Sequence, residues 1–446
     1  MEIIRGFIGI LSILTIAFLF SNNKKKINWK LVLVGMLIQF TFAFFIIWSD
    51  TLQNFFYPLG IPKMLIAGLG GWIVNLLNYT IEGSKFVFGN LAINYGDGSM
   101  GFFFAFQVLP TIIFVSSLTS VLYYLGVLQK VVQGMAWFMA KLLGTSGAES
   151  LSNTANIFVG QTEAPLLIRP YISSMTKSEI YTIMVGGMAT IAGGVMAAYI
   201  QMLGHSFAKF SNIPIETAQI NFAVQLLAAS VIAAPAGLVI SKIIYPETEI
   251  PLTKGTVKLK VEKNATNLVE AAATGASDGL QLALNVGGML LAFIALISMF
   301  NGILTWCGDL FSVNEYFRNS YGQPLSMQLI FGLILQVVAI AIGVPWGDAM
   351  NFGSLIGTKV VLNEFVAYMD LAKMIDAGII SEKATMMATY ALCGFANFSS
   401  IAIQIGGISP MAPERKKDIA ALGMKAVLGG TLTTLLSATI GGIFYN

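Results

Sequence analysis

The stretch "VGQTEAPLLIRP", residues 159–170, places a glutamate and an arginine in a chain that is otherwise strongly apolar. Of its 446 residues, 56% are hydrophobic and only 11% are charged, and the mean hydropathy is +0.76. Soluble proteins contain roughly 25% charged residues, so this composition indicates an integral membrane protein. A charge at membrane depth is costly and usually functional, which makes Glu163 a candidate site residue.

The composition also argues against several classes of function. The net charge of +3 is small and the basic residues lie in short loops, so we expect no nucleic-acid partner. Cys307 and Cys393 lie in apolar surroundings, which is typical of buried small residues rather than disulfides. The single histidine, His205, excludes a multi-histidine metal site. An intramembrane hydrolase would need a nucleophile–base pair or a metal triad, and the apolar segments show neither, so we predict that the protein is not an enzyme.

Apolar stretches close to the ~20 residues that cross a bilayer predict eight membrane spans. They are residues 3–20, 29–48, 101–127, 178–204, 217–244, 279–305, 384–406 and 419–443. Lysines 24–26 place the first loop in the cytoplasm by the positive-inside rule, so both termini are predicted outside. Residues 61–83 are amphipathic and contain Gly68, Gly70 and Gly71, which predicts a bent helix along the membrane interface.

Two further segments, 145–173 and 345–374, are apolar but polar at their centres and are bounded by helix-breaking residues. If the eight spans hold, each segment begins and ends on one side of the membrane, so we predict two re-entrant helical hairpins. The first contains Glu163 and precedes "GGMATIAGGV" (186–195); the second contains Glu364 and precedes "ALCGFANFSS" (391–400). Two interrupted segments in inverted halves indicate the midplane site of a transporter.

The predicted fold is therefore an all-α polytopic membrane protein with eight transmembrane helices and two re-entrant hairpins in inverted repeats. The predicted divisions are peripheral helices with an interfacial helix (1–127), a first repeat (128–244), a cytoplasmic loop (245–278) and a second repeat (279–446). Asp348 follows Pro345 closely, and we interpret it as a helix-start cap rather than a ligand contact.

Three motifs in this order resemble the concentrative nucleoside transporters. They are "NIFVGQTEAPLLIRPY" (156–171), "GTKVVLNEFVAY" (357–368) and "ALCGFANFSSIAIQIGG" (391–407). The second matches the family signature G-x-K-x-x-x-N-E-F-V-A, and the resemblance covers roughly residues 95–443. It implies two re-entrant hairpins and two unwound helices around one nucleoside and a cation, in a homotrimer. A bacterial member would lie in the plasma (inner) membrane, among its lipids.

The resemblance also implies which residues bind the nucleoside. Gln161, Thr162 and Glu163 match the positions for the base, Glu364, Asn397 and Ser400 match those for the ribose, and Val195 and Phe395 match the pocket wall. A neutral nucleoside in a dry cavity calls for amides, hydroxyls, acceptor carboxylates and an apolar wall, which these residues supply. The two glutamates also have structural interpretations. Glu163 would form a buried salt bridge with Arg169, and Glu364 would cap a helix or pair with Lys359.

For sodium, the resemblance implies Asn156, Val159, Thr190 and Ile191 as the binding set. A side-chain amide, a hydroxyl and backbone carbonyls are hard oxygen ligands that suit a small hard cation. In the alternative interpretation, Asn156 caps its helix and Thr190 bonds back to its own turn.

We therefore expect a sodium-coupled symporter, without another cofactor, that imports uridine, cytidine and adenosine. In the family, the positions of Gly160 and Gln161 help to separate pyrimidines from purines; glycine leaves room for a purine. Proton coupling, with Glu163 or Glu364 changing protonation, is the first alternative. An intramembrane hydrolase and a passive channel are the second and third alternative functions.

Overall fold

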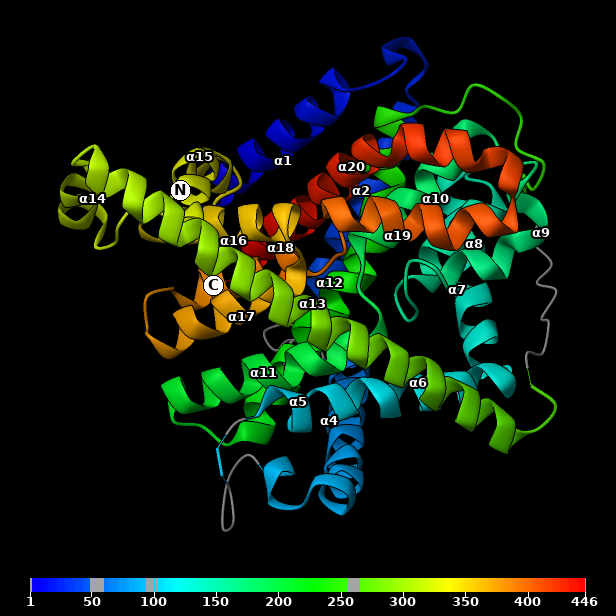
Figure 1. The fold of residues 1–446 in the computed structure, drawn as a ribbon. Coiled ribbons are helices and arrows are strands. Elements are labelled where there is room, and N and C mark those ends of the chain that lie inside the picture. The colour runs from blue at the N-terminus through cyan, green and yellow to red at the C-terminus, as the bar shows by residue number, and fades with distance from the viewer. Residues whose placement is uncertain (1, 49–59, 94–99, 102, 256–264, 446) are drawn as a thin grey trace.

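In the computed structural model, the described residues are 2–48, 60–93, 100–101, 103–255 and 265–445, and their regular elements are all helices (Figure 1). Seven helical segments of this part of the chain are long and apolar enough to cross a membrane: Trp29–Ile47, Met64–Ala92, Phe104–Tyr124, Lys177–Ser211, Ile215–Ile244, Leu268–Leu310 and Pro413–Phe444. The predicted all-α membrane fold is confirmed. The division into eight spans and two re-entrant hairpins stays a prediction.

The first helices are α1 (Glu2–Leu19), α2 (Trp29–Ile47) and α4 (Ile61–Phe88). The glycines of α4 do not interrupt it, because the helix runs unbroken for 28 residues. Gly70 has a packing role there, since an added Cβ would lie 3.3 Å from the Cβ of Ala223 on α12 (Ile215–Ile244). Close helix packing thus explains a glycine that the sequence suggested as a break.

After α4, the short helix α5 (Phe104–Gln107) leads into α6 (Leu109–Tyr124) and α7 (Val127–Leu143). The long helix α13 (Leu268–Leu310) crosses the molecule and lies beside α6 (Figure 1). Its contact with α6 is close, because a Cβ added at Gly275 would lie 2.5 Å from the Cβ of Ser120. These helices form one wall of the region described below.

The observed bounds of α13 differ from two predicted boundaries, the end of the loop and the start of the following span. We predicted a span over 279–305 after a loop over 245–278, but the helix has 43 residues and already begins at Leu268. Asn267 starts it early, since its side chain accepts a 2.9 Å hydrogen bond from the Glu270 N–H and so caps the first turn. Of the predicted loop, residues 256–264 lie outside the described residues.

The first repeat begins with the chain reversal at 145–173. Helix α8 (Gly147–Ala155) leads into a turn, and η4 (Ala164–Ile168) and α9 (Arg169–Ile172) return along it. We call this segment hairpin 1. Next, α10 (Lys177–Ala189) and α11 (Gly193–Ser211) are the two parts of a helix that is broken at residues 190–192, and α12 completes the repeat.

Buried charges tie the start of hairpin 1 to its neighbours. Helices α8 and α10 both begin with a capping box, and the Ser146 hydroxyl of one donates to Glu179 of the other at 2.5 Å. Glu149 of α8 forms a 2.7 Å ion pair with Lys242 of α12, and both side chains are buried. These buried polar contacts therefore hold the start of hairpin 1 against α10 and α12.

The sequence analysis missed α14 (Val313–Tyr321) and α15 (Met327–Ala341). With 15 residues, α15 is short for a span, and it packs along α16 (Ala349–Val361) instead. Glycines allow this contact, because a Cβ at Gly353 would lie 2.8 Å from the backbone nitrogen of Gln336.

The second repeat has the same order of elements as the first. After η5 (Trp346–Asp348), α16 and α17 (Glu364–Asp376) form hairpin 2, which covers the predicted segment 345–374. Helices α18 (Glu382–Leu392) and α19 (Phe398–Ile408) are the parts of a helix broken at residues 393–397. Two short turns, η6 (Ser409–Met411) and η7 (Pro413–Arg415), lead to α20 (Lys416–Phe444). In both halves of the chain, a helical hairpin thus precedes a broken helix. That these halves are inverted repeats with re-entrant hairpins stays a prediction.

Candidate functional site

The two helix breaks meet in the interior. The Phe395 N–H of the second break donates to the Thr190 carbonyl of the first at 3.3 Å, and the turn of hairpin 1 joins them because Gly193 N–H donates to the Phe158 carbonyl at 3.2 Å. Asn363 and Asn397 cap α17 and α19 with their side chains, so both helices begin at this junction. Polar groups that unbroken helices would hide are therefore gathered at one place.

A cavity of about 160 Å³ opens at this junction. All eight residues predicted to bind substrate line it: Gln161, Thr162, Glu163, Val195, Glu364, Phe395, Asn397 and Ser400. Apolar residues of α13, among them Leu282, Val286 and Leu290, complete the wall. The cavity has a polar side, built by the hairpins and breaks, and an apolar side, which is the arrangement that small-molecule sites favour.

Glu364 is a buried acceptor of the cavity. Its buried carboxylate accepts hydrogen bonds from the Tyr199 hydroxyl at 3.2 Å and from the Asn397 amide at 2.9 Å. A carboxylate has about four acceptor positions, so at least one is left for a ligand hydroxyl. The alternative pairing with Lys359 is not observed, since the Lys359 ammonium donates to the Ala391 carbonyl and the Thr434 hydroxyl.

The turn of hairpin 1 is held against α19. The side-chain amide of Gln161 makes both contacts. Its Nε2 donates to the Ser400 hydroxyl at 3.2 Å, and its Oε1 accepts from the Gln404 amide at 3.1 Å. Gln404 also donates to the Met184 carbonyl of α10 at 2.9 Å. The sequence analysis missed Gln404 and Tyr199, although each lies four residues after a predicted site residue, Ser400 and Val195, and hence on the same helix face.

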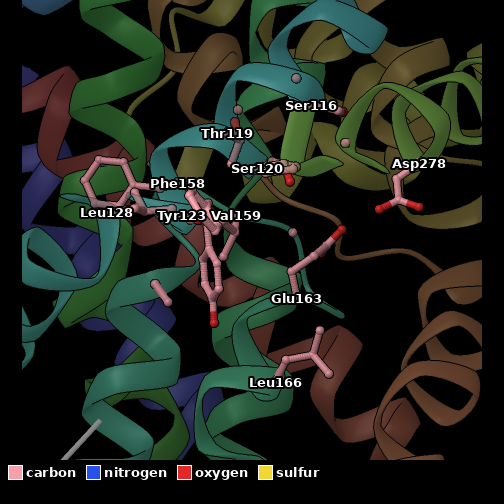
Figure 2. Close-up of a pocket in the computed structure, with 18 of the residues that line it drawn as sticks. Ser116, Thr119, Ser120, Tyr123, Leu128, Phe158, Val159, Glu163, Leu166 and Asp278 are labelled. Carbon is pink, nitrogen blue, oxygen red and sulfur yellow. The ribbon is translucent and has the colours of Figure 1, made fainter. Parts of the chain in front are cut away.

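Glu163 lies at the edge of the cavity and is exposed. Its carboxylate accepts from the Thr162 hydroxyl at 3.1 Å, and the described part of the chain shows no ion pair with Arg169. Glu163 also lines a larger, adjoining cavity of about 330 Å³ between hairpin 1 and helices α6 and α13. Figure 2 shows this vestibule, with Asp278 of α13 and the hydroxyl residues Ser116, Thr119 and Ser120 of α6 around it.

The predicted sodium residues surround the first break. The Asn156 amide nitrogen donates to the Ser152 carbonyl, which leaves its Oδ1 buried and without a partner among the described residues. The Thr190 hydroxyl donates to the Gly186 carbonyl at 3.1 Å, so its lone pairs remain free to accept. Ile191 is buried and Val159 half-buried. Asn156 thus caps α8 and Thr190 bonds back to its own turn, as the alternative interpretation expected. The unpaired oxygen of Asn156 nevertheless fits a cation ligand.

Asp348 has a structural role. Its carboxylate accepts from the Ser381 N–H at 3.1 Å and from the Ser381 hydroxyl at 2.6 Å. Asp348 is the N-cap residue of α16, the helix-start position that the sequence predicted. Its side chain makes no cap hydrogen bond there and instead fixes the start of α18 against hairpin 2.

Three family patterns match the chain. The pattern described as Na+ dependent nucleoside transporter N-terminus matches residues 8–91, nucleoside recognition matches 105–206, and Na+ dependent nucleoside transporter C-terminus matches 225–442. Both hairpins, both breaks and the helices before them therefore fall within matched or directly adjoining segments.

Individual proteins are similar along the whole chain. An uncharacterized transporter of Haemophilus influenzae is 46% identical over 100% of this chain and 98% of its own length. The nucleoside permease NupC of Helicobacter pylori is 41% identical over 98% of this chain and 96% of its own. The solved structure of CNTnw in an inward-facing substrate-bound state is 41% identical, with a TM-score of 0.85 and 100% of both chains covered.

Replacing Gln404 by leucine should loosen the turn of hairpin 1, because Gln161 and the Met184 carbonyl lose their shared buried donor. Such a loss costs about 1–3 kcal/mol, which corresponds to a roughly 5- to 150-fold rise in the open population. Hydrogen exchange of the backbone at residues 157–163 should accelerate accordingly. Gln281→Leu, on an exposed face of α13, is the control. Equal exchange in both variants would show that Gln404 does not hold the turn.

Proposed function

The chain belongs to the concentrative nucleoside transporters as a bacterial member, and we propose that it imports nucleosides together with sodium. It is a multi-pass membrane transporter of nucleosides, not an enzyme. The observation that supports the finer proposal is the cavity of about 160 Å³ at the two breaks, which is lined by all eight residues expected for the substrate. The partly unpaired oxygens of the first break lie beside it.

We assign the ribose to the second repeat. Ribose hydroxyls donate and accept, and the carboxylate of Glu364, the amide of Asn397 and the hydroxyl of Ser400 offer both kinds of partner within one wall. The side-chain Oδ1 of Asn397 accepts from the Ser399 hydroxyl and the Ser400 N–H, so the side-chain amide is fixed with its nitrogen toward Glu364. A preorganised set of this kind lowers the entropy cost of binding.

The base then lies toward hairpin 1. Gln161, Thr162 and Glu163 line the same cavity from the other repeat and present amide, hydroxyl and carboxylate groups to a base edge. The Phe395 ring and Val195 supply apolar wall for the flat ring. The vestibule of Figure 2 adjoins the cavity at Gly160 and Glu163, and we propose that it is part of the substrate path.

We propose sodium rather than a proton as the coupling ion. The side chains of Asn156 and Thr190 and the carbonyls of Val159 and Ile191 would supply hard oxygen ligands, and two of the matching family descriptions name Na+ dependence. In this proposal the ion holds the turn of hairpin 1 against the first break, and alternating access follows from movement of the hairpins with their broken helices.

For the whole assembly, we propose a homotrimer in the plasma membrane with both termini outside. Helix α13 supports this, because most of its length is exposed in a single chain and it bears many apolar side chains on that surface. Neighbouring copies and lipids would cover these side chains.

The replacement Glu364→Gln should abolish uridine uptake while the protein stays folded in detergent. The neutral amide loses charge-assisted bonds to ribose hydroxyls, each worth about 1.5–3 kcal/mol, so affinity should fall at least about tenfold. Uptake of labelled uridine into proteoliposomes measures this, with Glu216→Gln as the control because that carboxylate is exposed and outside the cavity. Normal uptake by the Glu364 variant would reject the ribose assignment.

Sodium coupling predicts that uptake rises with a sodium gradient and persists without a pH gradient, when the two are imposed separately. Asn156→Ala removes the unpaired Oδ1 and should remove the sodium stimulation. Asn285→Ala, at an exposed position of α13, is the matched control. If the Asn156 variant keeps its sodium dependence, the ion binds elsewhere; uptake driven by the pH gradient alone would mean proton coupling.

Selectivity should be broad for the base and strict for the sugar. Unlabelled adenosine and cytidine should compete with uridine, whereas uracil should not, since it leaves Glu364, Asn397 and Ser400 without hydroxyls to bind. Gly160→Ser should narrow the range toward pyrimidines, because an added Cβ lies 2.3 Å from a Glu163 carboxylate oxygen and crowds the base. Strong competition by uracil with none by adenosine would contradict this geometry.

A further inference from the structure

Tyr199 contacts the proposed ribose wall from outside the cavity. It lies on α11, four residues after Val195, and it is fully buried. It is not among the described residues that line the cavity at the two breaks. Its hydroxyl donates to Oε1 of Glu364 at 3.2 Å. A buried tyrosine hydroxyl needs a partner, and here the partner is a carboxylate from the other half of the chain.

Aromatic packing fixes the Tyr199 ring. The ring packs against that of Tyr368 on α17 with the centroids 4.2 Å apart, and Phe365 lies edge-to-face with it at 5.1 Å. Phe365 in turn lies edge-to-face with Phe104 of α5 at 5.2 Å. The ring is therefore held by neighbours from hairpin 2, and its hydroxyl has a fixed place beside Glu364.

The Glu364 carboxylate is thus held at both of its oxygens. Oε1 accepts from Tyr199, and Oε2 accepts from the Asn397 amide at 2.9 Å. Each carboxylate oxygen has about two acceptor positions, so one position is left on each oxygen. A glutamate side chain has several rotatable bonds, and fixing them in advance lowers the entropy cost of binding a ligand.

We propose that Tyr199 is a positioning residue for the sugar, because its hydroxyl holds the Glu364 carboxylate in the orientation that accepts ribose hydroxyls. This inference rests on the proposed assignment of the ribose to Glu364, and it adds a residue from the first broken helix. Asn397 holds the other oxygen from the second broken helix, so both halves of the chain orient the acceptor. In the alternative role, Tyr199 only fills space between α11 and α17.

Replacing Tyr199 by phenylalanine keeps the ring and removes only the hydroxyl. Affinity for uridine should fall about threefold to tenfold, the range of one ordinary hydrogen bond. An analogue that lacks the hydroxyl accepted by Glu364 does not use this bond, so its affinity should stay within about twofold of the wild-type value.

Titration calorimetry of the purified protein in sodium buffer, with uridine, 2′-deoxyuridine and 3′-deoxyuridine, measures these affinities. The deoxyuridine that binds the wild type more weakly identifies the hydroxyl in question. The ratio of its Kd to that of uridine should shrink about threefold to tenfold in Tyr199→Phe.

Tyr368→Phe is the matched control. Tyr368 packs against Tyr199 and is equally buried, but its hydroxyl donates to the Thr389 carbonyl at 2.7 Å and not to Glu364. Both variants lose a bonded hydroxyl from the same aromatic pair, so both should lower the melting temperature. Only Tyr199→Phe should shrink the Kd ratio.

An unchanged ratio in Tyr199→Phe, or an equal shrinkage in Tyr368→Phe, would overturn the positioning role and leave packing as the role of Tyr199. A different result contradicts the proposed function instead: wild-type protein that binds both deoxyuridines as tightly as uridine does not use the ribose hydroxyls. If Tyr199→Phe does not survive purification, competition of the unlabelled deoxyuridines with labelled uridine uptake, in cells that express the variant, gives the same ratio.

Discussion

Every backbone group that a broken helix releases in an apolar interior must find another partner, and this requirement organises the molecule. Both breaks lie where the chain provides substitutes: asparagine caps start α17 and α19, a tyrosine hydroxyl and a lysine close the end of α18, and the two breaks bond to each other. Within the described residues, the last four carbonyls of α18 all accept a hydrogen bond, whereas those of Gly187, Met188 and Ala189 at the end of α10 accept none across the first break. What the chain leaves unpaired is available to ions and substrate.

The junction also explains how two ligands can be linked without direct contact. Thr190 contributes its hydroxyl to the predicted ion set, while its carbonyl accepts from the Phe395 N–H, and the residue Phe395 lines the substrate cavity. A shift of the first break therefore reaches the substrate wall through one hydrogen bond. Gln161 makes a second connection, because it joins the turn of hairpin 1 to Ser400 and Gln404 of α19. Mutual stabilisation of this kind is the physical basis of coupled binding.

The sequence predicted the two hairpins and the two helix breaks because their signals are local, whereas the individual cavity residues follow from the resemblance to a known family. Polar residues amid apolar runs, with glycine and proline at the borders, mark hairpins and breaks at Glu163 and Glu364. Features set by packing were not predictable in this way. Helix α15 is stabilised by its contact with α16, and Gly70 of α4 is a spacer against α12. The early start of α13 is different, because the Asn267 cap is a local signal that the sequence analysis overlooked. Tyr199 and Gln404 entered the site only because distant elements bring Glu364 and Gln161 to them.

The ion pair of Glu149 and Lys242 has a consequence for how the chain is assembled. Glu149 precedes its partner by a hairpin and a broken helix, and the pair is buried at a place where a lone carboxylate would cost several kcal/mol. Until α12 has been made, the Glu149 carboxyl therefore has to stay hydrated or take up a proton. Lys359 is in the same position, since the Ala391 carbonyl and Thr434 come later in the chain. In both repeats, biogenesis can complete the hairpin only after the last helix of that repeat has entered the membrane.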